Sequence, residues 1–487
     1  MNILIAASEA APFAKTGGLA DVCGALPVEL SQLDCNATLI IPAYSQAISR
    51  ANAQPTGIKF SVPIGDKTVE GAILKTTLPN STVPVYLIQQ DQYFNRSGIY
   101  QQPNGSDYGD NCARFVFFSR AVMEAIRLLD LKVDIIHAND WQTGLIPAYL
   151  KTEYHLFPRY EKIASVFTIH NLAYQGSFWH WDMALTGLDW KYFNYEQMES
   201  YGRLNLIKTG IAFADRISTV SPNYAREIQS YPLGCGLEGI LKFRQKDLFG
   251  ILNGIDTNVW NPETDPQIET NYTLSDWRKG KAACKAALQR QMGLPEQPDA
   301  PLIGSVGRLS YQKGYDMIAE IMRQIVPQHP AQWVILGTGE ACYQDMLRRL
   351  QEEFPNKAAV RLVYSDKIAH QIIAGSDLFL MPSRYEPCGL TQMYSLRYGT
   401  LPVVHATGGL ADTVVNTTKE TLADETANGF SFADDNMEQF SACLNSALWT
   451  YYQKETWDSL VERAMGEDWS WKKSAQEYIK LYKQIKK

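Results

Sequence analysis

Short apolar runs alternate with longer segments of helical periodicity along the whole chain. Several runs are continuous stretches of Val, Ile and Leu, a pattern typical of parallel strands covered on both faces. The sequence predicts strands at 2–7, 37–41, 85–89, 134–137, 164–169, 216–220 and 248–252, and in the second half at 302–306, 332–336, 360–363, 378–381 and 401–405. Strand–helix alternation in both halves predicts an α/β protein built from two doubly wound domains.

The chain has 487 residues, which is too many for one ordinary hydrophobic core. A turn-forming segment that contains Pro262, at 253–262, predicts a hinge near mid-chain. We therefore expect one domain at 1–255 and a second at 256–465. The final segment is 466–487, and within it 469–487 has the periodicity of an amphipathic helix, with one face formed by Trp471, Ala475, Tyr478 and Tyr482.

Composition excludes several classes of function. Apolar residues make up 45% of the chain and charged residues 20%, as in ordinary globular proteins. The net charge of −7 argues against a general nucleic-acid binder, so an anionic substrate needs locally placed cations. No stretch approaches the length of a membrane span, and the first residues do not form a signal peptide. The eight scattered cysteines lack a Cys-x-x-Cys pair, which predicts reduced thiols in a cytoplasmic protein and no metal site.

The hexapeptide Thr-Gly-Gly-Leu-Ala-Asp occurs twice, at 16–21 and at 407–412. Each copy lies between a predicted strand and a predicted helix, where bare backbone N–H groups can bind a phosphate. The alternative interpretation is a tight strand–helix turn that needs glycine for its backbone angles. Lys15 precedes the first copy and can reach a bound anion. Because this lysine comes before the glycines, the spacing is not that of a Walker ATPase loop.

Two further strand ends in the second half carry charged groups. Arg308 and Lys313 follow the strand at 302–306, at the edge where open α/β sheets bind ligands, and together suit a diphosphate. The alternative is a pair of solvated surface cations. Glu386 follows the strand at 378–381 and precedes a helix that begins near Thr391. This carboxylate can orient sugar hydroxyls or stabilise positive charge, although a helix-capping acid is an equal alternative.

His170 and Asp140 each follow a predicted strand of the first half, so both face the same edge of that sheet. A lone histidine is more often structural, which leaves both interpretations open. Aromatic residues crowd 178–195 and suit carbohydrate rings, although core packing explains aromatic residues more often. The chain lacks Asp-x-Asp, His-Glu-x-x-His and Gly-x-Ser-x-Gly, which disfavours metal-dependent sugar transfer, metalloprotease and serine hydrolase activities.

Four motifs, in order along almost the full length, resemble those of bacterial glycogen synthases and plant starch synthases, glycosyltransferase family 5: KTGGLADV at 15–22, HNLAYQG at 170–176, GRLSYQKG at 307–314 and EPCGLTQ at 386–392. The resemblance implies a GT-B fold, two Rossmann-like domains with the active site in the cleft between them. The domain at 1–255 is then the acceptor side, the domain at 256–465 binds the nucleotide sugar, and the helix at 466–487 crosses back to the first domain.

The same resemblance implies a retaining transfer of glucose from ADP-glucose to the non-reducing end of an α-1,4-glucan, with glycogen, starch or a malto-oligosaccharide as acceptor. It implies no cofactor, no metal and no nucleic-acid or membrane partner. The residues that it implies for catalysis are His170, Glu386, Arg308 and Lys313, and those for substrate binding are Lys15, Gly17, Gly18, Asp21, Asp140, Asn171, Asn253, Tyr364, Cys388, Gly389, Leu390 and Thr391.

Two places depart from the expected pattern. Tyr394 stands where many GT-B enzymes carry a second Glu that bonds ribose, so the ribose contact stays open. Asn139 and Gln142 stand where basic or imidazole side chains are expected, which bears on acceptor handling. Rival hypotheses are a sucrose-type synthase, a glucan phosphorylase and a non-catalytic glucan-binding protein. A phosphorylase needs a lysine for pyridoxal phosphate near the C-terminus, where all candidate lysines lie on a polar helix. The intact set of motif residues disfavours a degenerate scaffold.

Overall fold

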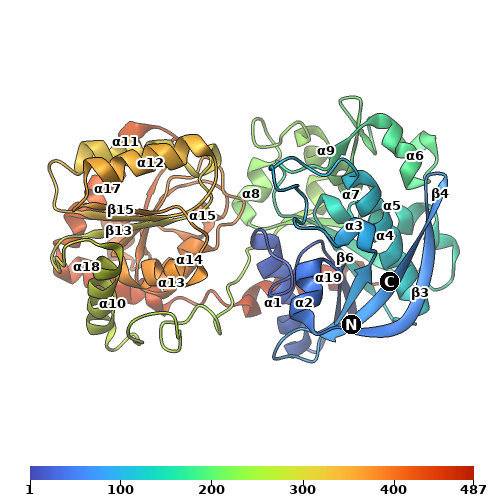
Figure 1. The fold of residues 1–487 in the computed structure, drawn as a ribbon, viewed down its shortest axis with the longest axis horizontal. Helices are drawn as coiled ribbons and strands as arrows, with labels where there is room; N and C mark the ends of the chain where they lie inside the picture. Colours follow the sequence, from blue (N-terminus) through green and yellow to red (C-terminus); the bar gives the residue numbers. More distant parts are fainter. The chain divides into compact units, whose positions relative to one another are not determined.

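The computed structural model describes residues 1–487 and consists of two compact units. The first comprises Met1–Gly254 together with Trp471–Lys487, and the second comprises Ile255–Ser470. Each unit has a central sheet with helices on its faces (Figure 1). These sheets confirm the prediction of two doubly wound α/β domains. None of the helices combines the length and the apolar composition that crossing a lipid bilayer requires.

The first unit is built on a nine-stranded sheet in the order β12-β11-β7-β6-β1-β2-β5-β4-β3. All seven predicted apolar runs of this half match a strand to within two residues at each end, because most of these strands are buried on both faces. The strands are β1 (Asn2–Ala6), β2 (Asn36–Pro42), β3 (Gln54–Ile64), β4 (Lys67–Thr77), β5 (Pro84–Gln89), β6 (Ile135–Asn139), β7 (Ala164–Ile169), β11 (Arg216–Thr219) and β12 (Leu248–Gly250).

The hairpin β3–β4 was not predicted from the sequence. Both strands run antiparallel in the sheet, β3 against β4 and β4 against β5, so the sheet is mixed rather than purely parallel. Their residues alternate between buried and exposed positions, which makes a weaker signal than a continuous apolar run. The two residues between the strands, Gly65 and Asp66, are a hairpin signal that could have revealed this pair.

Helices cover this sheet, and the first unit also contains a small separate sheet of three short strands. The short strands are β8 (Ser177–Phe178), β9 (Glu199–Ser200) and β10 (Arg203–Asn205). The helices of four or more residues are α1 (Gly18–Gln32), α2 (Ser45–Ala51), α3 (Asp91–Phe94), α4 (Asn111–Leu128), α5 (Leu145–Thr152), α6 (Met183–Thr186), α7 (Leu206–Phe213), α8 (Pro222–Glu227), α9 (Glu238–Phe243) and α19 (Trp471–Ile485).

The C-terminal helix α19 belongs to the first unit and packs on α1. The four residues expected on its apolar face are all buried. The Tyr482 hydroxyl lies 2.8 Å from Nδ1 of His137 on β6, and Nε2 of that ring lies 2.5 Å from the Thr168 hydroxyl. Burial, together with the nearby His170, lowers the pKa of His137 to about 3, so its ring is neutral. A hydrogen-bonded chain through the sheet therefore anchors the end of the polypeptide.

The second unit has a six-stranded, wholly parallel sheet in the order β15-β14-β13-β16-β17-β18. In Figure 1, α11 and α12 lie on one face of this sheet, and α10, α13 and α14 lie on the other. The strands are β13 (Leu302–Val306), β14 (Gln332–Leu336), β15 (Ala358–Arg361), β16 (Leu378–Met381), β17 (Leu401–His405) and β18 (Phe430–Phe432). The strand predicted at 360–363 was displaced by two residues, because β15 runs from Ala358 to Arg361, and the three-residue β18 was missed.

The helices of the second unit are α10 (Trp277–Met292), α11 (Tyr315–Ile325), α12 (Ala341–Glu353), α13 (Asp366–Gly375), α14 (Thr391–Arg397), α15 (Gly408–Thr413), α16 (Lys419–Ala423), α17 (Met437–Tyr451) and α18 (Lys454–Gly466). Parallel strands send their following loops to one edge of the sheet. The loops after β13 and β16, which carry most of the predicted site residues of this unit, and the loop after β17, which carries the second hexapeptide, therefore gather at that edge.

Candidate active site

An ion pair joins two predicted site residues of the second unit. Nζ of Lys313 contacts Oε2 of Glu386, and the Ser383 hydroxyl donates to the same oxygen at 3.1 Å. The Glu386 side chain is 9% exposed and that of Lys313 is 27% exposed. Such partners offset the cost of burying a carboxylate. The two residues meet because β13 and β16 are neighbours in the sheet. This rules out the interpretations of Lys313 as a solvated surface cation and of Glu386 as a helix cap.

Close backbone packing holds the loop of Lys313. Gly314 has φ +69°, and a Cβ there would lie 2.2 Å from the carbonyl oxygen of Pro382. Only glycine allows this approach of the two loops. Arg308 lies in the same loop and is exposed. The loop after β13 therefore presents both predicted cations at the strand-end edge.

The second hexapeptide packs directly on the Glu386 loop. The Gly409 N–H donates to the carbonyl oxygens of Glu386 at 3.1 Å and of Pro387 at 3.2 Å. A Cβ on Gly408, whose φ is +46°, would lie 1.9 Å from the Glu386 carbonyl oxygen. The phosphate-cradle interpretation is thus wrong for the Gly409 amide, because the protein backbone already uses it. This copy of the repeat therefore holds the backbone of the Glu386 loop in place.

The remaining predicted residues of this unit lie in two places. Cys388, Gly389, Leu390 and Thr391 form the turn into α14, which the Gln392 amide braces by donating to the carbonyls of Cys388 at 3.1 Å and Gly389 at 2.9 Å. Cys388 is buried. Tyr364 lies three residues beyond the end of β15 and is 75% exposed. Its hydroxyl donates to the Asp366 carboxylate at 2.9 Å.

Tyr394 is part of an aromatic stack rather than a carboxylate site. Its ring lies 3.9 Å from that of Trp260, centroid to centroid, with 8° between the planes. On the other face of Trp260 the ring of His370 lies at 3.7 Å. His370 Nδ1 in turn lies 2.6 Å from the Asp265 carboxylate. Tyr394 therefore forms one end of a stack of three rings with Trp260 and His370, and no glutamate is present at this position to bond ribose.

In the first unit, a carboxylate that sequence reasoning missed organises the first hexapeptide. Glu9 is 3% exposed and accepts hydrogen bonds from the Thr16 N–H, from the Thr16 hydroxyl at 2.7 Å and from the Tyr100 hydroxyl at 2.6 Å. Burial raises its pKa, although these bonds and one from the Gly17 N–H oppose the rise. The expectation that the loop amides are bare is wrong for Thr16 and Gly17. An acid three residues beyond the end of β1, in a mostly apolar segment, was the available signal.

Lys15 and Asp21 of the same loop form an ion pair, with Nζ 2.7 Å from Oδ1. The Lys15 side chain is 39% exposed, so solvent screens this pair. Gly17 precedes α1 in an extended conformation, and nothing lies within 4 Å of where its Cβ would be. The loop therefore offers a cation and an open backbone surface.

Asp140 and His170 lie together at the ends of β6 and β7, which pair in the sheet. The Asp140 carboxylate accepts the His170 N–H at 2.8 Å. Burial raises the pKa of Asp140 to about 7, and the negative charge of Glu9 adds to this rise. Hydrogen bonds from the N–H groups of His170 and Asn171 act in the opposite direction and lower the pKa. Asp140 also has φ +57° with ψ −179°, a backbone region almost reserved for glycine. Strain and a shifted pKa in one residue are typical of functional sites.

His170 is held by its side chain as well as by its backbone. Nε2 lies 2.9 Å from Oδ1 of Asn139, and burial lowers the pKa of His170 to about 3. Its ring is therefore neutral. Asn253, another predicted residue, is 5% exposed, and its Oδ1 is buried without a hydrogen-bond partner. An unsatisfied buried acceptor is rare and is compatible with a ligand contact.

Part of the aromatic segment lies on the surface. Trp179, Trp181 and Trp190 are 59%, 56% and 43% exposed. Their rings contact one another edge to face, with centroids 6.4 Å apart between Trp179 and Trp181 and 5.5 Å apart between Trp181 and Trp190. These three tryptophans are therefore not core residues, and the core-packing alternative does not explain them.

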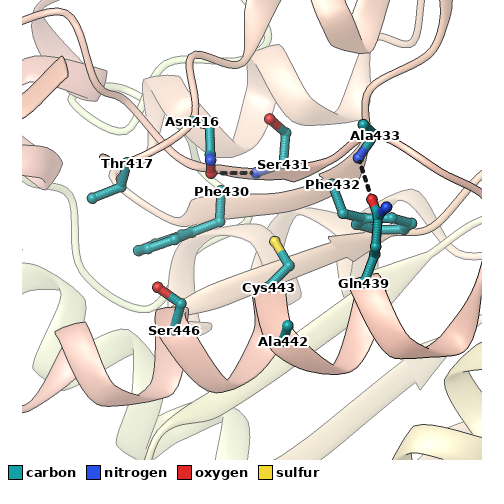
Figure 2. A pocket seen from close by; sticks show the side chains of 10 residues that line it. All are labelled: Asn416, Thr417, Phe430, Ser431, Phe432, Ala433, Gln439, Ala442, Cys443 and Ser446. Atoms are coloured by element: carbon teal, nitrogen blue, oxygen red, sulfur yellow. Dashed lines mark hydrogen bonds between the residues drawn. The ribbon is translucent and has the colours of Figure 1, made fainter. Parts of the chain in front are cut away.

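A cavity of about 290 Å³ lies elsewhere, between β18 and α17. Figure 2 shows the Cys443 thiol directed into it, with Phe430 and Ser431 on the strand side. Burial raises the pKa of this thiol to about 12, so it stays protonated. None of the predicted site residues lines the cavity. The structure holds no group of three or more His, Cys, Asp or Glu side chains arranged to bind a metal ion.

Comparison with known proteins supplies the family. Residues 2–243 match the model of the starch synthase catalytic domain, and residues 290–460 match that of group 1 glycosyl transferases. The chain is 47% identical to a glycogen synthase of Rhodopirellula baltica, over 99% of this chain and 97% of that protein. It is 46% identical to a glycogen synthase of Syntrophotalea carbinolica, over 99% and 98% of the two chains.

A solved structure is similar over the same length. The catalytic domain of starch synthase IV from Arabidopsis thaliana, bound to ADP and acarbose, matches with a TM-score of 0.91 at 33% identity, covering 99% of each chain. Both sheets and their connections therefore have the GT-B architecture. The chain belongs to the glycogen synthase and starch synthase family of glycosyltransferases.

Proposed function

We propose that this protein transfers glucose from ADP-glucose to the non-reducing end of an α-1,4-glucan, with retention at the anomeric carbon. The observation that carries the proposal is the full-length similarity to a starch synthase whose structure contains ADP and acarbose. The eight free cysteines support a reducing, cytoplasmic setting for this reaction.

Charge supports the roles of the second unit. Departure of a diphosphate requires cations, and Arg308 and Lys313 supply them at the strand-end edge. Glu386 fixes the Lys313 ammonium and turns its other oxygen to sugar hydroxyls. The turn from Cys388 to Thr391 offers further hydrogen-bond donors to the donor substrate, and Tyr364 offers an exposed ring to adenine.

The first unit supplies the acceptor side. Lys15, Gly17, Gly18 and Asp21 contact the sugar nucleotide, while Asp140, Asn171 and Asn253 line the place of transfer. His170 lies beside the reacting carbon. The bond from the anomeric carbon to the ADP oxygen breaks as the acceptor 4-hydroxyl attacks from the same face, and the departing phosphate takes the hydroxyl proton. The transition state is oxocarbenium-like.

The test is transfer of labelled glucose to glycogen, with ADP-glucose and UDP-glucose supplied in parallel. We expect transfer from ADP-glucose. Preference for UDP-glucose would refute the donor alone, and no transfer from either would refute the function. Fructose as acceptor, and phosphorolysis of glycogen, separate the sucrose-type and phosphorylase alternatives. A trapped covalent glucosyl-enzyme would contradict same-face attack.

Variants test the site itself. Lys313→Ala and Glu386→Ala are expected to lower kcat by orders of magnitude while the folded protein persists. Glu296→Ala is the matched control, because Glu296 forms a surface ion pair with Arg290 at 3.0 Å. Turnover like that of the wild type in either site variant would remove that residue from the mechanism.

A further inference from the structure

Asn139 is a fully buried amide at the end of β6 with three partners. Its Nδ2 donates to the carbonyl oxygens of Ala6 at 3.2 Å and of His137 at 3.1 Å. Its Oδ1 lies 2.9 Å from Nε2 of His170. Its side chain is 0% exposed, so no water replaces any of these contacts. This residue is one of the two departures from the expected motif.

These contacts determine which end of the amide faces His170. Carbonyl oxygens only accept hydrogen bonds, so the NH₂ group must point toward Ala6 and His137. A flipped amide would place oxygen against two oxygens and lose both bonds. Oδ1 therefore faces the imidazole, and because this oxygen also only accepts, Nε2 of His170 must carry a hydrogen.

The other ring nitrogen follows from charge. Burial keeps His170 neutral, since its pKa is lowered to about 3. A neutral imidazole carries one hydrogen, so Nδ1 has a lone pair. No hydrogen bond within the protein engages Nδ1; the contacts of His170 are those of its N–H and of Nε2. Nδ1 is therefore the acceptor that His170 offers.

We propose that Asn139 is a positioning residue that fixes His170 as the Nε2–H tautomer, so that Nδ1 accepts a hydrogen bond from a hydroxyl of the glucosyl substrate. The identity of that substrate rests on the proposed function. A cationic side chain at position 139 would instead donate to Nε2 and leave the hydrogen on Nδ1. The departure at Asn139 thus concerns the reacting sugar rather than the acceptor chain alone.

The first test is spectroscopic and needs no activity. Nitrogen-15 spectra of the full-length protein, with histidine labelled and His170 assigned from a His170→Gln variant, report the tautomer directly. We expect Nε2–H in the wild type. Asn139→Leu, similar in size but without polar atoms, should abolish the preference. An Nδ1–H ring in the wild type, or an unchanged tautomer in Asn139→Leu, would overturn the proposal.

Gln142→Leu is the matched control. Gln142 is also a buried amide of this motif, 4% exposed, and its Oε1 has no hydrogen-bond partner. This variant should keep the wild-type tautomer of His170. Asn139→Leu should lower kcat by about 10–100-fold, the scale for groups that orient functional histidines, with the KM for glucan changed less than about two-fold. Loss of the tautomer preference in both variants would reduce Asn139 to a packing residue and refute the proposal.

Asn139→Asp decides the case if Asn139→Leu does not fold. A carboxylate gives up the two bonds to the Ala6 and His137 carbonyls, but it still accepts from Nε2 and stabilises the imidazolium, so the pKa of His170 rises. The nearby titratable groups are Asp140, which accepts the His170 N–H, and His137 on the same strand. We expect kcat/KM of this variant to fall with decreasing pH around one new ionisation absent from the wild type. A wild-type pH profile would contradict the proposal. Absence of transfer by the wild type would refute the function, while the spectra still decide the tautomer.

Discussion

The same substitution placed in the two copies of the hexapeptide is expected to destabilise the protein in one copy and to leave its stability almost unchanged in the other. Gly17→Ala and Gly408→Ala change equivalent positions of identical sequence. Gly17 lies in extended backbone with φ −159°, and nothing lies within 4 Å of a Cβ there. Gly408 has φ +46°, and a Cβ there would lie 1.9 Å from the Glu386 carbonyl oxygen. The difference arises only from what each loop packs against.

The magnitude at Gly408 has two parts. Alanine in left-handed backbone costs about 1–2 kcal/mol. Relieving the overlap with a backbone oxygen costs about 1–3 kcal/mol more, by analogy with overpacked cores. The free energy of unfolding should therefore fall by about 2–5 kcal/mol, which lowers Tm by roughly 4–20 °C at about 2–4 °C per kcal/mol. Gly17→Ala should stay within about 0.5 kcal/mol of the wild type.

Calorimetric unfolding of the full-length protein measures both variants, with the transition of the second unit followed for Gly408→Ala. Transfer activity adds a second readout, because displacing the Glu386 backbone should also lower kcat. Gly17→Ala lowers activity without lowering Tm if substrate approaches this backbone closely. A wild-type Tm for Gly408→Ala would refute the packing argument, and a large loss of Tm in Gly17→Ala would refute the open surface at the first copy.

Three further outcomes are expected. Burial raises the pKa of Asp140 to about 7, so kcat/KM should rise with pH through about 7 as the carboxylate forms and strengthens its bonds to the backbone N–H groups. The folded state should lose stability as pH rises from about 4 to 7, because the folded protein holds the proton of Asp140 more tightly than the unfolded chain does. Asp140→Asn should flatten both pH profiles. Tyr482→Phe leaves Nδ1 of His137 unpaired and should cost about 1–3 kcal/mol in urea unfolding, and an unchanged midpoint would contradict the anchoring of α19. Trp181→Ala should weaken co-sedimentation of the protein with glycogen, whereas Trp449→Ala, at a tryptophan that is 69% exposed, should not. Equal binding by the two variants would show that the exposed tryptophans at 179–190 do not bind glucan.

Prediction from sequence succeeded where the local signal was strong. The six residues of the strand at Ala164–Ile169 are all buried and, apart from Ser165, are apolar or β-branched, so the bounds of this strand were predicted to the residue. The hairpin β3–β4 was missed because its half-exposed strands dilute the same signal. Motifs at strand ends identified Lys313 and Glu386 as candidates, yet spacing alone did not reveal that they pair.

By itself, the sequence determined the two α/β domains, the family and the strand ends that carry chemistry, because burial patterns and glycine-containing loops are local properties. Tertiary structure decided the partners. Glu9 accepts the Thr16 N–H, Asn139 accepts a hydrogen bond from Nε2 of His170, and Gly408 packs against the Glu386 carbonyl. Each of these contacts joins loops or strand ends whose proximity depends on strand order or on the path of a loop. Two identical hexapeptides consequently differ in their tolerance of a single methyl group, since each meets different atoms.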